Sequence, residues 1–160
     1  WSAPLAADPA GPRARGVALH ESFGSIVAAV LELQWRRDEA TPRVTRVVLA
    51  ADVGTVLQPD GVRQQLEGSV VFALGAALRH GITVREGAVT ARNLPDQPLP
   101  RLAECPRIET HLVPSSAEPT GIGEPGVPVI APALANALAA LSGRRLRRLP
   151  LDLASLPRPV

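Results

Sequence analysis

Apolar and polar residues alternate over three stretches near the start of the chain, which is the pattern of half-buried β-strands. The stretches read "GVALHES", "SIVAAVLELQW" and "RVTRVVLAADVG". Phe23-Gly24 joins the first two and the polar turn "RRDEATP" joins the last two, so the pattern predicts three strands connected by turns. Further along, "ITVREGAVTAR" predicts a hairpin that turns at Glu86-Gly87, and "RIETHLV" predicts another strand.

A helical repeat replaces the alternation in "QPDGVRQQLEGSVVFALGAALRHG". Asp60 is predicted to cap the start of this helix, and His80-Gly81 to stop it. Gly68 and Gly75 each weaken a helix by about 1 kcal/mol relative to alanine, so they predict close packing against another backbone. The residues of the apolar face are Val62, Leu66, Val70, Ala73 and Ala77.

A second helical stripe lies near the end of the chain and comprises Ile130, Leu134, Leu138 and Leu141. Pro132 would remove a backbone hydrogen bond inside a helix, so the helix is predicted to begin between Val129 and Ala131. Ser142-Gly143 is the predicted stop. The following "RRLRRLPL" predicts a last strand.

Strands and helices are therefore mixed without strict strand–helix–strand alternation, which favours the α+β class, with a mixed sheet of short strands packed against two main helices. Residues 15–151 are predicted to form one domain. Residues 1–14, rich in Pro, Ala and Gly, predict a linker or extended arm, and residues 152–160 a tail.

Composition narrows the functional classes. The chain has 160 residues, a formal net charge of +2, two Phe, two Trp and no Tyr. Such a small charge and so few aromatic residues give no reason to expect a nucleic-acid partner. Cys105 is the only cysteine, which excludes a disulfide framework, and no apolar run reaches the roughly 20 residues that cross a bilayer. Because the chain contains no Met, we expect a processed chain or part of a longer one.

The loop "PTGIGEPG" allows two interpretations. The spacing Gly121-x-Gly123-x-x-Gly126 resembles a dinucleotide-binding turn, but that turn requires a strand before it, a helix directly after it and an acidic residue about 20 positions later. Prolines interrupt both flanks here, and the downstream region reads "SGRRLRR". The dinucleotide interpretation is therefore disfavoured.

The second interpretation makes Glu124 the functional group. Gly121 and Gly123 allow the backbone to press against a ligand, and Pro125 fixes the chain direction after the acid. A carboxylate held in a rigid, partly dry loop is suited to act as a general base. The alternative, that Glu124 only caps the following helix, is equally consistent with the residues.

The other polar candidates are weaker. Gln65, beside Gly68, could present its amide to a cofactor or simply face solvent. Asp52 is predicted to form a turn. The histidines, on three separate elements, do not have metal-ligand spacing, and Cys105 has no neighbouring base, so no metal ligand and no nucleophile is expected. The histidines are His20, His80 and His111.

Three segments resemble one family: "RGVALHESFGSIVAAVLEL", "ADVGTVLQPDGVRQQLEGSVVFALGAAL" and "EPTGIGEPGVPVIAPALANALAALSGRRLRRLPL". They are similar to the C-terminal part of the molybdopterin-binding large subunit of the xanthine dehydrogenase and aldehyde oxidase family. The isoquinoline 1-oxidoreductase β-subunit type is the most similar branch. The resemblance covers most of residues 15–151, and its more specific motifs are "QLEG" and "GIGEPG".

The resemblance implies a molybdenum hydroxylase that oxidises an aldehyde or N-heterocycle at an electron-poor carbon, with water as the oxygen source. Glu124 matches the family's general base. Gln65 matches a position that hydrogen-bonds the pterin, and Gly68 and Gly123 are expected cofactor contacts beside these residues. "NLPDQPLPR", residues 93–101, departs from the branch, which often has an aromatic and histidine-bearing segment there.

The resemblance also implies the cofactors and partners. They are molybdopterin with molybdenum, as the cytosine dinucleotide form, held mainly by upstream parts of the same subunit, and a small subunit with 2Fe-2S clusters. The 160 residues alone are then expected to be inactive, and the compartment to be the periplasm, with the cytoplasm as the alternative. Two other hypotheses stay open: a non-catalytic interaction module without cofactor, and a split-gene small subunit that completes another chain's site.

Overall fold

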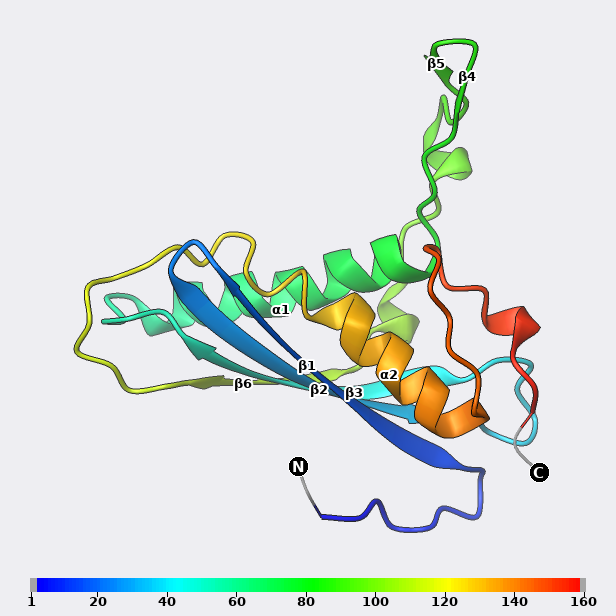
Figure 1. The fold of residues 1–160 in the computed structure, drawn as a ribbon, viewed down its shortest axis with the longest axis horizontal. Helices are drawn as coiled ribbons and strands as arrows, with labels where there is room; N and C mark the ends of the chain where they lie inside the picture. The colour runs from blue at the N-terminus through cyan, green and yellow to red at the C-terminus, as the bar shows by residue number, and fades with distance from the viewer. Residues whose placement is uncertain (1–2, 159–160) are drawn as a thin grey trace.

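The computed structural model describes residues 3–158, which form a sheet covered by helices on one face, with a protruding hairpin arm (Figure 1). The four-stranded sheet has the order β1-β2-β3-β6, and only the β3–β6 pair is parallel. Its strands are β1 (Arg13–Ser22), β2 (Ser25–Gln34), β3 (Arg43–Asp52) and β6 (Arg107–Leu112). This architecture, with α1 (Pro59–Leu78) and α2 (Ile130–Ser142), confirms the predicted α+β class.

The predicted hairpins are confirmed. Phe23 and Gly24 have φ of 53° and 76° and form the two-residue turn between β1 and β2, as the right-handed strand twist favours. Glu86-Gly87 turns the chain between β4 (Val84–Arg85) and β5 (Ala88–Val89), at the tip of the arm. Short 3₁₀ helices, Leu94–Asp96, Leu102–Glu104 and Leu153–Ser155, complete the elements.

The core lies between the sheet and the two helices. On β2, Val27, Ala29 and Leu31 are fully buried, and they face the helices because successive side chains of a strand alternate between faces. Helix α2 packs on β1 and β2, and α1 packs on α2 and β6. The start and stop of α2 agree with the prediction, since Gly143 adopts a left-handed conformation directly after Ser142.

The cap of α1 differs from the prediction. The helix begins at Pro59, and the Gln58 side chain accepts a hydrogen bond from the Gly61 amide, so Gln58 is the N-cap. Asp60 lies inside the first turn, where it pairs with Arg63 at 3.0 Å. Pro at the first helical position sets the start two residues earlier than an Asp60 cap would allow.

The expected strand at "RRLRRLPL" is wrong. Residues 144–150 form no strand, and the backbone N–H of Leu151 instead donates to the carbonyl of Ala77 at 2.7 Å. The segment crosses the end of α1 rather than a sheet edge, so it has no neighbouring strand with which to pair.

The predicted packing of the α1 glycines is also wrong. A Cβ at Gly68 would have nothing within 4 Å, and one at Gly75 would meet the side chains of His80 and Pro100 rather than another backbone. The Gly68 backbone is therefore open to a ligand instead of to another helix.

The ends of the chain take part in the fold. β1 starts at Arg13, and near the other end Leu151 and Leu156 are buried in the core. Parts of the predicted linker and tail, residues 1–2 and 159–160, lie outside the described residues. No described helix is both long and apolar enough to cross a membrane.

Candidate functional site

The "PTGIGEPG" loop is tethered to the β1–β2 turn at its first end. The Thr120 amide donates to the Val53 carbonyl at 3.0 Å, and the Gly121 amide donates to the Phe23 carbonyl at 3.2 Å. The buried Ser25 hydroxyl bonds the Thr120 hydroxyl at 2.7 Å. These bonds fix the loop before it reaches Gly123.

The second end of the loop packs against α1. The Pro125 side chain is fully buried, and Gly126 lies so close to α1 that a Cβ there would come within 2.1 Å of the Ser69 hydroxyl. The Glu124 carbonyl accepts a hydrogen bond from the Val127 amide at 2.8 Å, which closes the turn. Gly123 and Glu124 are therefore presented between two fixed points.

The loop and α1 enclose a shallow cavity of about 260 Å³ that brings together all four predicted site residues. Gln65, Gly68, Ser69 and Phe72 recur at helical spacing, so they form one side of α1 facing the loop. The loop contributes Gly123, Glu124 and Val127. A chain segment more than 50 residues away from α1 in sequence thus completes a site that neither segment forms alone.

Glu124 is not a helix cap. Helix α2 begins at Ile130 with Val129 as its N-cap, and Val129 makes no side-chain capping bond. The carboxylate is exposed within this chain rather than partly dry. It is therefore available to a group that enters the cavity.

The cavity leaves the backbone of α1 and of the loop open to a bound group. A Cβ at Gly68 or at Gly123 would meet nothing within 4 Å, so both backbones are open to close approach. Gln65 is exposed beside them and offers both amide donors and an acceptor. The donor set suits the heteroatoms of a pterin and lacks the thiolate or imidazole ligands that would bind a metal directly.

Phe72 is a site residue that the sequence reasoning missed. Its side chain is 66% exposed although it is large and apolar, and it lines the cavity one turn beyond Gly68. Its position two turns after Gln65, on the same side of the helix, could have indicated this role. Apolar periodicity alone does not distinguish such a residue from a core residue.

Gly68→Ala tests whether the open backbone of α1 serves a ligand. Because the added methyl has open space and alanine favours helix, we expect the free energy of unfolding without cofactor to rise by about 0.5–1 kcal/mol. A cofactor bound in this cavity would meet the added methyl group, so for a full-length subunit we expect lower molybdenum retention. Metal analysis and unfolding of the same variant measure both effects, and unchanged retention would remove Gly68 from the site.

The remaining candidates lie elsewhere. Asp52 forms the predicted turn, since its carboxylate accepts a hydrogen bond from the Gly54 amide at 3.1 Å. His20 and His111 lie on strands and His80 follows α1, and within residues 3–158 no three His, Cys, Asp or Glu side chains are grouped as a metal site. Cys105 is half-buried at the wall of a different cavity.

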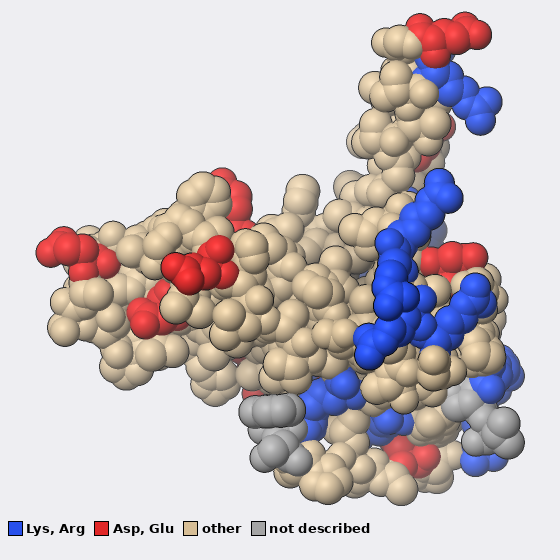
Figure 2. Space-filling model, viewed as in Figure 1, with Lys and Arg blue, Asp and Glu red and all other residues tan. Residues whose placement is uncertain are grey.

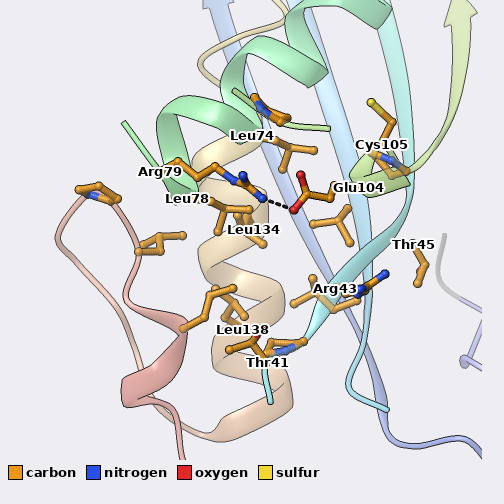
Figure 3. Close-up of a pocket in the computed structure, with 18 of the residues that line it drawn as sticks. Thr41, Arg43, Thr45, Leu74, Leu78, Arg79, Glu104, Cys105, Leu134 and Leu138 are labelled. Carbon is orange, nitrogen blue, oxygen red and sulfur yellow. Dashed lines mark hydrogen bonds and ion pairs between the residues drawn. The ribbon is translucent and has the colours of Figure 1, made fainter. Parts of the chain in front are cut away.

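That larger cavity has a volume of about 780 Å³ and lies between α1, α2 and the chain around Cys105 (Figure 3). Leu74, Leu78, Leu134 and Leu138 give it an apolar wall, and an ion pair between Arg79 and Glu104 spans it. It contains none of Gln65, Gly68, Gly123 and Glu124. Its size alone does not make it the catalytic site, because its two carboxylates are already engaged: Glu104 pairs with Arg79, and Asp152 accepts a hydrogen bond from the Ala154 amide at 3.1 Å.

Charge is distributed unevenly over the surface. Figure 2 shows Asp and Glu side chains gathered toward the end of the molecule that carries the candidate loop, and basic side chains gathered elsewhere. Arg145, Arg147 and Arg148, in the segment after α2, are exposed.

Comparison with known proteins places these residues in a family. The profile described as Molybdopterin cofactor-binding domain matches residues 13–106. The chain is 38% identical over 145 residues to the β-subunit of isoquinoline 1-oxidoreductase of Brevundimonas diminuta, covering 91% of this chain and 19% of the relative. It is 33% identical to a nicotinate dehydrogenase subunit of Pseudomonas putida, over 87% of this chain and 12% of the relative.

Solved structures share the fold. Quinoline 2-oxidoreductase from Pseudomonas putida 86 superposes with a TM-score of 0.66 at 21% identity, over 79% of this chain and 17% of that chain. The chain spans less than a fifth of the length of these curated relatives. The matches confirm the resemblance inferred from the sequence: the chain belongs to the molybdopterin cofactor-binding domain family.

Proposed function

We propose that this chain forms part of the catalytic subunit of a molybdenum hydroxylase that oxidises an aldehyde or an N-heterocycle at an electron-poor carbon, with water as the oxygen source. The observation that carries the proposal is the convergence of Gln65, Gly68, Gly123 and Glu124 on one cavity in a chain of the molybdopterin-binding family. The relatives named isoquinoline 1-oxidoreductase and nicotinate dehydrogenase support the substrate class.

Glu124 is the proposed general base. A general base must hold its carboxylate within hydrogen-bond reach of the proton that it takes. The bonds at Thr120 and Gly121 and the buried Pro125 restrict where the Glu124 backbone can move, so this residue is held at the cavity before substrate arrives. Removing a proton from water at that point makes the water oxygen a nucleophile.

The cofactor, when bound, supplies the redox chemistry that accepts an electron pair from the substrate. Gln65 is proposed to hydrogen-bond the pterin through its side-chain amide, while Gly68 and Gly123 allow close contact with its edge. Phe72 and Val127 form the apolar rim of the same cavity and exclude water around these contacts. This chain then supplies positioning and proton transfer.

The form of the cofactor, the partner subunit and the compartment are proposed from the family resemblance. We propose the cytosine dinucleotide form of the cofactor, a small partner subunit that carries the 2Fe-2S clusters and takes the electrons, and the periplasm as the compartment. Most of the cofactor is proposed to be held by other parts of the same subunit, which accords with the shallow cavity of about 260 Å³ formed by this chain.

Gln65→Ala is expected to weaken cofactor retention or to slow turnover several-fold, because removal of one neutral hydrogen-bond partner costs about 0.5–1.5 kcal/mol. The measurement is the molybdenum content and kcat of the full-length subunit. Gln64→Ala is the matched control, since Gln64 is equally exposed on α1 but does not line the cavity. Wild-type values for both variants would exclude Gln65 from the site.

Metal analysis of the full-length subunit tests the proposal itself. Purified from cells that synthesise the molybdenum cofactor, the subunit is expected to contain molybdenum in stoichiometric amount. A stably folded subunit without molybdenum would contradict the proposal and favour a non-catalytic interaction module that retains the fold.

A further inference from the structure

The sheet has a second face that the two helices do not cover. Gly16 faces α2, because a Cβ there would come within 2.0 Å of the Ala133 carbonyl. Its neighbours along β1, Val17 and Arg15, therefore point to the opposite side of the sheet. The strand register places six apolar residues of this outer face side by side: Val17, Leu19, Ile26, Ala28, Val30 and Val48.

The composition of this outer face is unusual for a surface in contact with water. An antiparallel sheet that is solvated on one side normally carries polar residues there. Here Leu19 is 68% exposed, Ile26 41% and Val17 36%. Val17 and Leu19 are successive residues of β1 on this face, and Leu19 and Ile26 are diagonal neighbours across β1 and β2. A contiguous exposed apolar surface of this kind marks a contact with another protein surface or a membrane.

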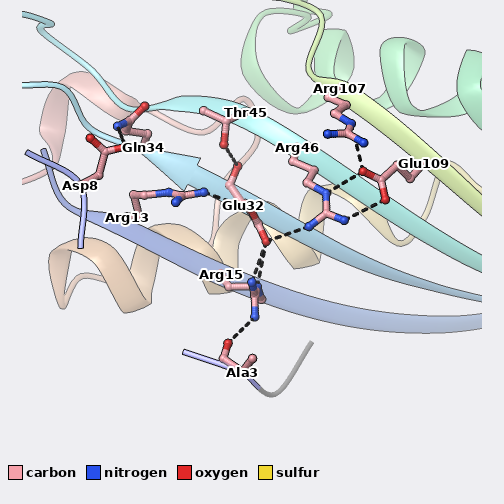
Figure 4. Close-up of polar contacts among 10 residues, drawn as sticks. All are labelled: Ala3, Asp8, Arg13, Arg15, Glu32, Gln34, Thr45, Arg46, Arg107 and Glu109. Carbon is pink, nitrogen blue, oxygen red and sulfur yellow. Dashed lines mark hydrogen bonds and ion pairs between the residues drawn. The ribbon is translucent and has the colours of Figure 1, made fainter. Parts of the chain in front are cut away.

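The charged residues at one end of the outer face are already paired (Figure 4). Glu32, whose side chain is only 5% exposed, accepts hydrogen bonds from Arg15 at 2.7 Å and Arg13 at 3.3 Å. Arg46 bonds both carboxylate oxygens of Glu109, at 2.8 and 2.9 Å, and these bonds hold the pKa of Glu109 below its usual value. The arginines at this end are therefore engaged in ion pairs along the sheet.

The N-terminal segment lies against that same end. The Ala3 carbonyl accepts a hydrogen bond from Arg15 at 2.9 Å, and the Asp8 carboxylate accepts one from Gln34 at 2.8 Å (Figure 4). Arg15 and Gln34 both belong to the outer face. The same polypeptide therefore already covers the polar end of this face, while its apolar centre has no cover from residues 3–158.

We infer that the apolar centre of the outer face is the docking surface for another part of the same catalytic subunit, which packs there as a third layer. This inference rests on the proposed function, because it requires a subunit much longer than this chain. The chain spans 19% of the Brevundimonas relative, so a subunit of that length has ample further polypeptide. The occupant is an apolar helix or sheet face, since a sheet apolar on both faces is buried between two layers.

Site-specific photo-crosslinking in the full-length subunit tests the inference. Leu19→p-benzoylphenylalanine places the reactive group at the most exposed apolar position of the outer face. Irradiation followed by peptide mass spectrometry is expected to find cross-links to residues of the same polypeptide outside this 160-residue stretch. Leu57→p-benzoylphenylalanine, at a leucine that is 82% exposed in the loop before α1, gives the background for an exposed site.

Cross-links from position 19 to a second copy, to lipid or to nothing would overturn the inference. If the substituted subunit does not fold, hydroxyl-radical footprinting of the unsubstituted subunit replaces the cross-link. Labelling of Leu19 and Ile26 well below that of Leu57 is then expected, and equal labelling overturns the inference.

The molybdenum content of the same preparation separates the docking surface from the proposed function. A molybdenum-loaded subunit without cross-links contradicts the docking surface alone. A molybdenum-free subunit with cross-links contradicts the proposed function alone.

Discussion

Glu124→Gln is expected to lower kcat of the full-length enzyme by about 10²- to 10⁴-fold, the usual contribution of a general base. Glutamine keeps the size and hydrogen-bonding capacity of the side chain but cannot take a proton at neutral pH. The loop remains fixed, because its tethers at Thr120 and Gly121 do not involve the Glu124 side chain. Molybdenum content is therefore expected to stay near that of the wild type.

Glu118→Gln is the matched control for that variant. Glu118 is also an exposed glutamate just before the same loop, but it does not line the cavity. Its substitution is expected to leave kcat unchanged, which separates a loss of one particular base from a general loss of negative charge. Retention of wild-type turnover by Glu124→Gln at normal molybdenum content would contradict the assignment of the base.

Gly16→Ala is expected to give a large loss of stability. The added Cβ would lie 2.0 Å from the Ala133 carbonyl oxygen and 2.4 Å from the Ala137 amide nitrogen, and neither backbone atom can move without displacing α2. Overpacking of this kind costs about 1–3 kcal/mol and more where the contact is with backbone. Thermal unfolding of the full-length subunit should show a lower Tm, with reduced soluble yield.

Gly68→Ala serves as the comparison for Gly16→Ala, since the same methyl group there meets nothing within 4 Å. The two substitutions should therefore change the Tm of the cofactor-free protein in different ways: a large fall for Gly16 and little change or a rise for Gly68. A Gly16→Ala subunit as stable as the wild type would contradict the close approach of α2 to β1.

Local patterns predicted much of the fold. The alternation in β1, β2 and β3 indicated which residues form strands, and Phe23-Gly24 indicated the first turn because few residues other than glycine accept a positive φ. Gly143 likewise marked the end of α2. These features are determined by residues that are adjacent in the sequence, so the local sequence pattern is enough to predict them.

Features that depend on distant contacts were missed. "RRLRRLPL" forms no strand because the sheet offers it no neighbour. Gly68 was interpreted as a packing residue, although the space beside it is open. These features depend on which residues, distant in sequence, pack beside each position in the folded chain. The Gln58 cap of α1 is an exception, because it is a local bond to the Gly61 amide that was missed in favour of Asp60.

The candidate site likewise combines residues that the local sequence indicated with an arrangement that it did not. The glycine loop suggested Glu124 and the polar position near Gly68 suggested Gln65, and the resemblance supported both. Nothing local indicated that the two would share a cavity with Phe72. Their meeting depends on Pro125 and Gly126 packing against α1. Long-range packing therefore creates the site, and the residue types alone only suggest its chemistry.

The source of the oxygen atom in the product is the sharpest test of the proposed hydroxylation. The full-length enzyme is incubated with an N-heterocycle or aldehyde in water enriched in the heavy oxygen isotope, and the product is analysed by mass spectrometry. Hydroxylation based on proton removal from water at Glu124 predicts that the new oxygen carries the heavy label. Product whose new oxygen comes from dissolved dioxygen, or a molybdenum-loaded enzyme that adds no oxygen to any such substrate, would contradict the account.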